Sequence, residues 1–233
     1  MNRFSGKYFP LYLSEFIGCF FLIFFGCGAM VMSEVNEPFN GQIIPLVFGA
    51  VICVMIYAVG HISGAHFNPA VSIAFCSLKR LSPAKLIGYI LSQLLGALAG
   101  CLALMLIFGN DHSFGATVST VNTPSLLIIE FILSFSLMFV ITSVATDERA
   151  QGQLAGLSIG LTVFLAAAVF GPLTGASMNP ARTLAPALFS GELSDLLVYL
   201  LASVFGAVSG AKVYEWSRCQ VSDRSDNDEA GCC

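Results

Sequence analysis

Two polar stretches interrupt this otherwise apolar chain, and both contain the triplet Asn-Pro-Ala. The first is SGAHFNPAVS at residues 63–72, and the second is TGASMNPART at residues 174–183. Asparagine is a preferred N-cap residue, and proline suits the first helical position because its missing N–H would be unpaired there. We therefore predict that each triplet starts a helix. The two boxes comprise Asn68, Pro69 and Ala70, and Asn179, Pro180 and Ala181.

These residue types favour recognition of a solute over bond-breaking chemistry. Asparagine amides can donate hydrogen bonds to the oxygen of a passing molecule. Each helix N-terminus carries roughly +0.5 charge, so two such ends at one point repel cations, including hydronium. A water held by both amides turns its hydrogens away from its neighbours, which interrupts a proton relay. The alternative is that the boxes only cap two kinked helices.

The composition indicates where these boxes lie. The chain has 233 residues, of which 56% are hydrophobic and 10% charged, whereas soluble domains are about 25% charged. We predict an integral membrane protein. No stripe of Lys and Arg indicates a nucleic-acid partner, and the eight cysteines follow no metal-binding or disulfide spacing. No cofactor is implied, and no metal.

Six apolar segments are long enough to cross a bilayer, which takes about 20 residues. Two shorter apolar pieces begin at the boxes and are typical of re-entrant segments. We predict an all-α membrane protein with six transmembrane helices and two re-entrant half-helices. The six spans are 8–32, 41–60, 84–109, 124–146, 152–170 and 194–216, and the half-helices are 69–78 and 180–190.

The chain also repeats itself. Asn179 follows Asn68 by 111 positions, and Glu130 follows Glu15 by 115. Because each half has three spans, the second half must enter the membrane from the opposite side. Such inverted repeats place substrate sites near the midplane, between broken helices. We predict one channel domain at 1–217, with halves at about 8–110 and 124–217, and a disordered cytoplasmic tail at 218–233.

Charged residues predict the orientation. Nine of the ten Lys and Arg residues fall on one side of the six-span arrangement, together with both termini, and Arg182 is the exception. The positive-inside rule makes that side cytoplasmic. We expect a multi-pass protein of the plasma or inner membrane with both termini in the cytoplasm.

The two boxes, the six spans and the inverted repeat together resemble the aquaporin, or major intrinsic protein, family over residues 8–217. The resemblance implies a bundle of six spans and two half-helices, one pore per subunit and a homotetramer. It also implies a selectivity filter that contains Arg182, three residues after Asn179. By spacing, the other filter positions are Phe48, Ala167 and Ala176.

The filter departs from that of strict water channels, which usually have His at the position matching Ala167. Glycerol facilitators usually have Asp directly after the Arg, where this chain has Thr183. The second loop is more similar to nodulin-26-like channels and bacterial relatives. We predict a passive channel for water and small neutral solutes such as glycerol, which excludes protons and ions. Mercurials should not block at Ala176, where mercury-sensitive relatives often have Cys.

Four further polar residues belong to the candidate site in supporting roles. We expect Glu15 and Glu130 to accept hydrogen bonds from loop N–H groups that the interruptions leave unpaired; the alternative is an ion-coupling carboxylate pair. We expect His66 to border the pore and His61 to fasten the first loop.

Other functions stay open at this stage. A strictly water-selective channel is the alternative within the family. A coupled secondary transporter would need more ionisable residues along its path, and an anion channel of similar architecture would lack the paired boxes. We expect no enzymatic activity, because no catalytic set is placed at one depth.

Overall fold

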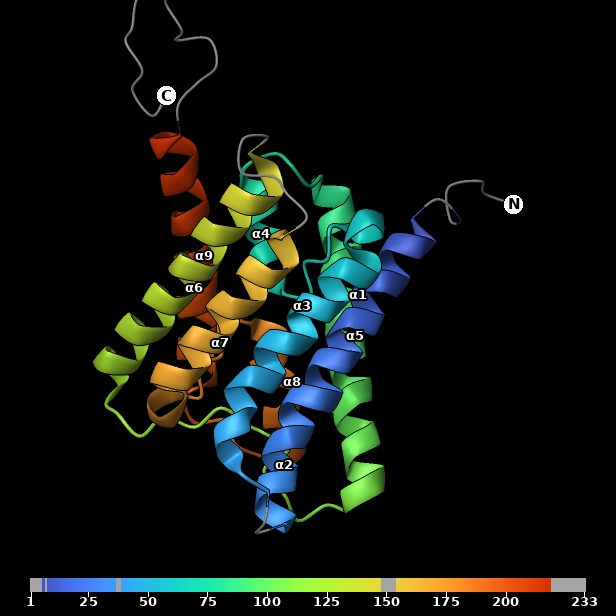
Figure 1. Ribbon diagram of the computed structural model, residues 1–233, viewed down its shortest axis with the longest axis vertical. Coiled ribbons are helices and arrows are strands. Elements are labelled where there is room, and N and C mark those ends of the chain that lie inside the picture. Colours follow the sequence, from blue (N-terminus) through green and yellow to red (C-terminus); the bar gives the residue numbers. More distant parts are fainter. Residues whose placement is uncertain (1–5, 7, 37–38, 148–153, 219–233) are drawn as a thin grey trace, which may run out of the picture.

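The computed structural model describes residues 6, 8–36, 39–147 and 154–218, and helices dominate this part of the chain (Figure 1). Apart from Arg218, the predicted tail lies outside the described residues. The elements are α1 (Phe9–Phe21), η1 (Leu22–Cys27), α2 (Gly28–Val35), η2 (Gly41–Ile43), α3 (Ile44–Ser63), α4 (Pro69–Ser77), α5 (Pro83–Phe108), α6 (Thr123–Thr146), α7 (Ala155–Thr174), α8 (Pro180–Ser190) and α9 (Leu196–Ser217).

Six helical segments of the described chain are long and apolar enough to cross a membrane, as predicted. The first differs in detail from the prediction, because it is interrupted by one π-helical segment, η1, between α1 and α2. The fifth, α7, continues to Thr174 instead of ending near residue 170. The helix continues past the predicted end because GPLT carries on the apolar run, and it closes at Gly175 in the left-handed conformation.

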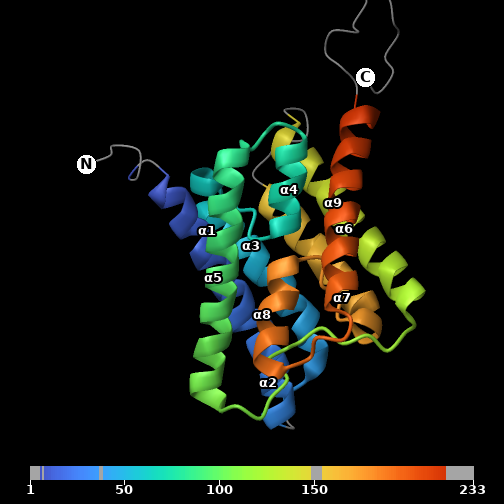
Figure 2. The ribbon, with the colours of Figure 1, turned by 180° about the vertical axis from the view of Figure 1, so that it is seen from behind.

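The two short helices confirm the inverted repeat. α4 lies in the half of the molecule that carries both termini, and α8 lies in the other half (Figure 2). Their N-terminal ends contact each other near the middle. The first half pairs α1 with α5, the second pairs α6 with α9, and α3 packs against α7 across the boundary. The sequence repeat thus corresponds to a repeat in space.

Glycines let the paired helices approach closely. A Cβ atom at Gly96 of α5 would lie 2.2 Å from the carbonyl oxygen of Phe16 on α1. The corresponding atom at Gly206 of α9 would lie 2.3 Å from the carbonyl oxygen of Phe131 on α6. Small residues at such crossings allow backbone-to-backbone packing, which drives helix association inside a membrane.

Glu15 holds the first box loop from α1, and its side chain is fully buried. Its carboxylate accepts from two backbone N–H groups of the loop, those of His66 at 3.0 Å and Phe67 at 2.8 Å. It also accepts from Ser63 Oγ at 2.7 Å and Gln93 Nε2 at 2.8 Å. The carboxylate therefore satisfies donors that the end of α3 leaves without a helical partner.

Glu130 does the same for the second loop from α6, and it is equally buried. Its carboxylate accepts from the N–H groups of Ser177 at 3.0 Å and Met178 at 2.9 Å, and from Thr174 Oγ1 at 2.8 Å. These contacts are those expected of a supporting residue. Both carboxylates are committed to loop donors, an arrangement that does not favour the alternative of an ion-coupling pair.

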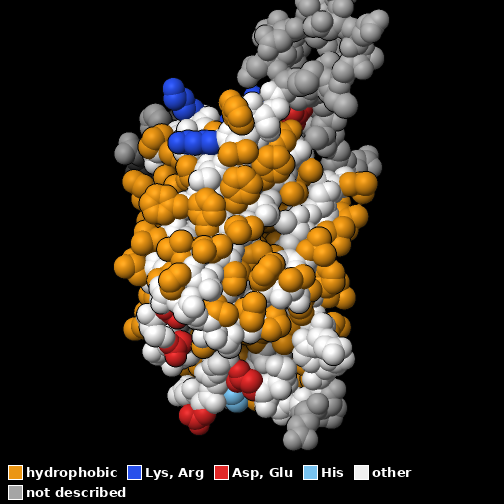
Figure 3. Space-filling model, turned by 90° about the vertical axis from the view of Figure 1, so that its left-hand side faces the viewer, with side chains coloured by type: hydrophobic (Ala, Val, Ile, Leu, Met, Phe, Trp, Pro, Cys, Tyr) orange, Lys and Arg blue, Asp and Glu red, His pale blue; other side chains and the backbone are white. Residues whose placement is uncertain are grey.

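The two ends of the molecule differ in charge. Figure 3 shows Lys and Arg side chains at one end, with most of the visible Asp and Glu side chains at the other. We call the first the termini end, because α1 begins and α9 ends there (Figure 1), and the second the far end. Described cations of the termini end are Lys79, Arg80, Lys85, Lys212 and Arg218.

Replacing Gly96 with Ala should destabilise the protein. The added methyl group would collide with the Phe16 carbonyl oxygen at 2.2 Å, and overpacking of this kind costs about 1–3 kcal/mol or more. Gly171 of α7 is a matched control, because a methyl group added there would have nothing within 4 Å. Thermal unfolding in detergent should show a lower midpoint for Gly96→Ala and no loss for Gly171→Ala; equal midpoints would contradict the close approach.

Replacing Glu130 with Ala should lower the yield and the thermal stability of folded protein. The change leaves the buried N–H groups of Ser177 and Met178 without an acceptor, at about 1–3 kcal/mol for each unsatisfied group. Size-exclusion chromatography and thermal unfolding measure the loss. The control is Glu192→Ala, which removes a far-end carboxylate whose contacts within the described part of the chain are with Ser194. A stable Glu130→Ala protein would argue against the anchoring role.

Candidate functional site

A cavity of about 870 Å³ passes between the two halves, and both boxes line it. At the termini end its walls include residues of α3 and the start of α7, and at the far end they include the start of α3 and the end of α7. The termini end is lined by Tyr57, His61 and Ala155, and the far end is lined by Gly41, Pro45 and Pro172. The lining therefore extends over most of the length of the spans.

The two Asn-Pro-Ala boxes start α4 and α8 as the sequence indicates. Asn68 is the N-cap of α4 in extended conformation, and its Oδ1 accepts from the Ala70 N–H at 2.8 Å. Asn179 caps α8 in the same way, with its Oδ1 2.9 Å from the Ala181 nitrogen. Pro69 and Pro180 are the first helical residues. Both helices thus point their positive ends at the middle of the cavity.

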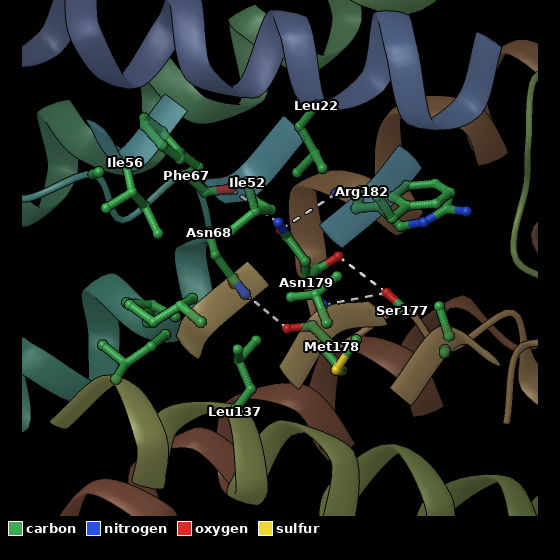
Figure 4. Close-up of a pocket in the computed structure, with 18 of the residues that line it drawn as sticks. Leu22, Ile52, Ile56, Phe67, Asn68, Leu137, Ser177, Met178, Asn179 and Arg182 are labelled. Carbon is green, nitrogen blue, oxygen red and sulfur yellow. Dashed lines mark hydrogen bonds between the residues drawn. The ribbon is translucent and has the colours of Figure 1, made fainter. Parts of the chain in front are cut away.

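Each asparagine also donates a hydrogen bond to the opposite loop, a contact that no pattern in the sequence indicates. Asn68 Nδ2 donates to the Met178 carbonyl oxygen at 2.7 Å, and Asn179 Nδ2 donates to the Phe67 carbonyl oxygen at 2.9 Å (Figure 4). One N–H of each amide therefore holds the two loops together. The second N–H of each amide is the donor that remains for a molecule in the cavity.

The loops reach this arrangement through left-handed backbone at residues other than glycine. Phe67 and Met178, which immediately precede the asparagines, have φ of 48° and 54°. Such values are uncommon for bulky residues and persist only where the surroundings enforce them. Here the N–H groups of both residues are bound by the buried glutamates and their carbonyls by the opposite asparagines. This backbone conformation therefore directs the carbonyl of Phe67 to Asn179 and the carbonyl of Met178 to Asn68.

Arg182 lies between the midplane and the far end, and its side chain is 3% exposed. Its Nη1 donates to the Gly115 carbonyl oxygen at 2.6 Å and contacts Cys27 Sγ at 3.4 Å, while Nη2 contacts Met30 Sδ at 3.2 Å. The guanidinium carbon lies 4.8 Å from the centroid of the Phe48 ring, a cation–π distance. The cation is thus held on one wall of the cavity.

The other residues predicted for the filter line the same cavity. Phe48, Ala167, Ala176 and Arg182 come from α3, α7, the second loop and α8, and all four border it. Phe48 and Ala176 are largely buried, at 7% and 5% exposure. The structure therefore brings an aromatic wall, two methyl groups and one cation to a single passage.

The two histidines lie at different places along the cavity. His61 has an exposed side chain on the last turns of α3 and lines the termini-end mouth, because α3 continues as a helix to Ser63. Within the described residues, no contact tests the expectation that it fastens the loop, which stays a prediction. His66 contacts α4: its Nδ1 lies 3.0 Å from Ser72 Oγ and its ring packs against Phe75. His66 also borders the cavity, as expected.

Three contacts of Arg182 had no signal in the sequence. Cys27 and Met30 lie in the uniform apolar run FFLIFFGCGAM, and Gly115 lies in the loop between α5 and α6. The π-helical segment η1 ends at Cys27 and changes the direction in which the residues after it point. Within the described residues, no group of three or more His, Cys, Asp and Glu is placed to hold a metal ion.

Comparison with known proteins connects this geometry to a family. A family described as "Major intrinsic protein" matches residues 5–214. The chain is 46% identical over 194 residues to "Aquaporin NIP1-1" of Oryza sativa subsp. japonica, covering 81% of this chain and 67% of that protein. It is 47% identical over 185 residues to "Nodulin-26" of Glycine max, covering 77% and 67%. The chain spans about two thirds of the length of these relatives.

The fold is also similar to a solved structure, the "aquaglyceroporin from Plasmodium falciparum". The TM-score is 0.81 and the identity 26%, over 91% of this chain and 97% of that one. Sequence and fold therefore lead to the same group of proteins. The chain belongs to the major intrinsic protein family, which is a family of membrane channels.

Proposed function

We propose that this chain is a passive channel for water and small neutral solutes such as glycerol, and that it excludes protons and ions. The observation that carries the proposal is one cavity that is lined by both Asn boxes and by Arg182. Family membership supports the channel class, and the names of the relatives and of the solved structure support water and glycerol as solutes.

The wall chemistry supports a neutral, hydroxyl-bearing solute. The lining of the passage is partly apolar and includes Phe48, Ile52 and Val163. Arg182 lies against the Phe48 ring, and its Nε–H and one Nη2–H have no partner among the described residues. A polyol can place its carbon face on the apolar lining and accept hydrogen bonds from the guanidinium. Pore diameter and lining donors set selectivity in channels of this kind.

The electrostatics support the exclusion of cations and protons. The N-terminal ends of α4 and α8 meet at the boxes, and Arg182 follows within one turn of α8. All three contribute positive potential to a passage enclosed by protein, where charges interact more strongly than in water. An anion would find favourable potential but would lose its hydration against an apolar wall, so the proposal favours neutral molecules over anions.

The small residues at the filter favour a broad solute range over strict water selectivity. Ala167 and Ala176 leave two sides of the passage without a bulky or donating side chain. The proposal therefore differs from a water-only channel in one testable property, the passage of glycerol.

We also propose the setting in which the channel works. The cations of the termini end support a cytoplasmic position for both termini, by the positive-inside rule. Exposed apolar residues on α3 and η1, such as Val54 and Phe25, form a lipid-facing or subunit-facing surface. Together with the family, they support a homotetramer in the plasma or inner membrane.

Replacing Arg182 with Val tests the exclusion of cations. The change removes a fixed positive charge from the passage, so leakage of protons or small cations should rise by on the order of tenfold, the effect of about 1.4 kcal/mol on a barrier. Water and glycerol should pass at least as fast as before. Proteoliposomes with a trapped pH dye and stopped-flow light scattering measure both.

The matched control is Arg80→Val, which removes a surface cation paired with Glu215 outside the cavity. It should change neither leak nor flux. A folded Arg182→Val protein that conducts neutral solutes poorly and shows no leak would assign Arg182 to the scaffold instead of the filter.

Replacing Ala167 with His tests the solute range. The imidazole would narrow the passage and add a donor at a position where the unmodified chain has only a methyl group. Glycerol flux should fall about tenfold or more, while water flux should change much less. Stopped-flow permeabilities for both solutes in the same proteoliposomes give the ratio. The proposal of a broad channel fails if the unmodified protein conducts water but excludes glycerol and urea alike.

A further inference from the structure

The loop between α5 and α6, residues 109–122, reaches the proposed filter from the far end. The Gly115 carbonyl oxygen of this loop accepts from Arg182 Nη1 at 2.6 Å. Gly115 has φ of 70°, and a Cβ atom there would lie 2.8 Å from Cys27 Cβ. The loop is therefore pressed against the first span at the point where it holds the guanidinium. Where Arg182 lies depends on where this loop lies.

Glu34, at the end of α2, holds the loop from the other side. Its carboxylate accepts from Ser113 Oγ, and its Oε2 lies 3.3 Å from the Ser113 nitrogen. Ser113 Oγ in turn accepts from the Gly115 N–H at 3.2 Å. A continuous chain of contacts thus runs from Glu34 through Ser113 and Gly115 to Arg182.

Glu34 lies one helical turn after Met30, which contacts the same guanidinium through its sulfur at 3.2 Å. α2 therefore approaches Arg182 by two routes, one direct through Met30 and one through the loop. The loop route is the one that carries ionisable groups. In the part of the chain that the structure describes, no other carboxylate contacts Ser113.

His112 adds a proton-dependent contact to this clamp. Its Nδ1 lies 3.4 Å from Glu34 Oε2, and its Nε2 lies 3.1 Å from the Phe108 carbonyl oxygen. Both ring nitrogens thus face oxygen acceptors. A neutral imidazole has one N–H and can satisfy one of them, whereas the protonated ring donates to both. The geometry therefore offers the protonated ring an acceptor at each nitrogen.

The charged groups around the ring are few. Glu34 faces it from α2, and the end of α5 presents the Phe108 carbonyl and ring. Asp111 precedes it within the loop. Arg182 is separated from it by Ser113 and Gly115 along the contacts described above.

We propose that Glu34 is a positioning residue for Arg182, and that protonated His112 strengthens its hold on the α5–α6 loop. The proposal rests on the filter role of Arg182 under the proposed function. It adds that the solute selectivity of the channel depends on the proton concentration at the far end, which the proposed orientation makes extracellular.

The physical consequence follows from the guanidinium. When His112 is neutral, the loop loses one contact to Glu34 or to Phe108, and the Gly115 carbonyl is held less firmly. Arg182 then spends more time turned into the cavity, where water can satisfy its Nη1 donors. A guanidinium in the passage obstructs glycerol, which fills the constriction, more than it obstructs water. Glycerol permeability relative to water should therefore fall as pH rises.

The test is the ratio of glycerol to water permeability in proteoliposomes at about pH 5.5 and about pH 8, a range over which histidine ordinarily changes charge. Taking the ratio removes differences in protein amount. The ratio for the unmodified protein should be about threefold lower at the higher pH, the factor that one net hydrogen bond is worth. Both Glu34→Gln and His112→Gln should show the low ratio at both pH values.

Glu192→Gln is the matched control. Glu192 is another far-end carboxylate that accepts from the nitrogen and hydroxyl of one serine, Ser194, but it makes no contact with the α5–α6 loop among the described residues. It should keep the full pH response. Ser113→Ala should also give the low ratio at both pH values. It removes the hydroxyl that donates to Glu34 and accepts from the Gly115 N–H, without altering a charge.

A pH-independent ratio in the unmodified protein would overturn the role of His112. A ratio that Glu34→Gln and Ser113→Ala both leave unchanged would overturn the positioning role of Glu34. Either result leaves the proposed function standing if Arg182→Val still raises cation leak, so the two proposals fail separately.

Discussion

The constraint on which this structure depends is that every backbone polar group at membrane depth needs a partner inside the protein. The two box loops interrupt helices at membrane depth, where lipid cannot replace the lost hydrogen bonds. Glu15 and Glu130 meet the constraint by accepting from two consecutive N–H groups in each loop. Tyr89 and Tyr199 meet it for the carbonyls, donating to Ser63 and Thr174 at 2.6 Å each. This pairing of a glutamate and a tyrosine with loop backbone groups appears twice because the chain repeats. It holds both loops in place without any contact from a solute.

Once the loops are fixed, their remaining polar groups become available for function. The carbonyls of Phe67 and Met178 point at the opposite asparagines, and these contacts join the two halves at the middle of the cavity. The half-helices then present their N-termini to the same point, so the positive potential there is a consequence of the architecture and needs no charged side chain. Arg182 adds a charge towards the far end only. This division separates the neutral donors of the boxes from the cation of Arg182.

The two halves of the repeat are not identical, and their differences make the two ends of the cavity unlike each other. The first span contains the π-helical segment η1, whereas the equivalent region of α6 is a continuous α-helix. The segment brings Cys27 to the guanidinium, and Met30 follows on α2. The first half also carries Gln93, which links Glu15 to Ser72, whereas Ser203 occupies the equivalent place in α9. Unequal side chains on an equal frame thus place the cation Arg182 and its contacts on one side of the boxes only.

The amino-acid sequence by itself determined the features that depend on neighbouring residues. Apolar runs of span length, Asn followed by Pro at a helix start, and the repeat at an offset of 111 all express local chemistry, so the six spans, both half-helices and their inverted order could be predicted. The supporting role of the two glutamates followed from the need to pair loop N–H groups. Tertiary structure alone decided which distant groups meet. Asn179 reaches Phe67 across 112 positions and Arg182 reaches Gly115 across 67, and no local pattern encodes such pairs. The contacts of His66 with Ser72 and Phe75 have the same origin, since they depend on how α4 packs beside the first loop.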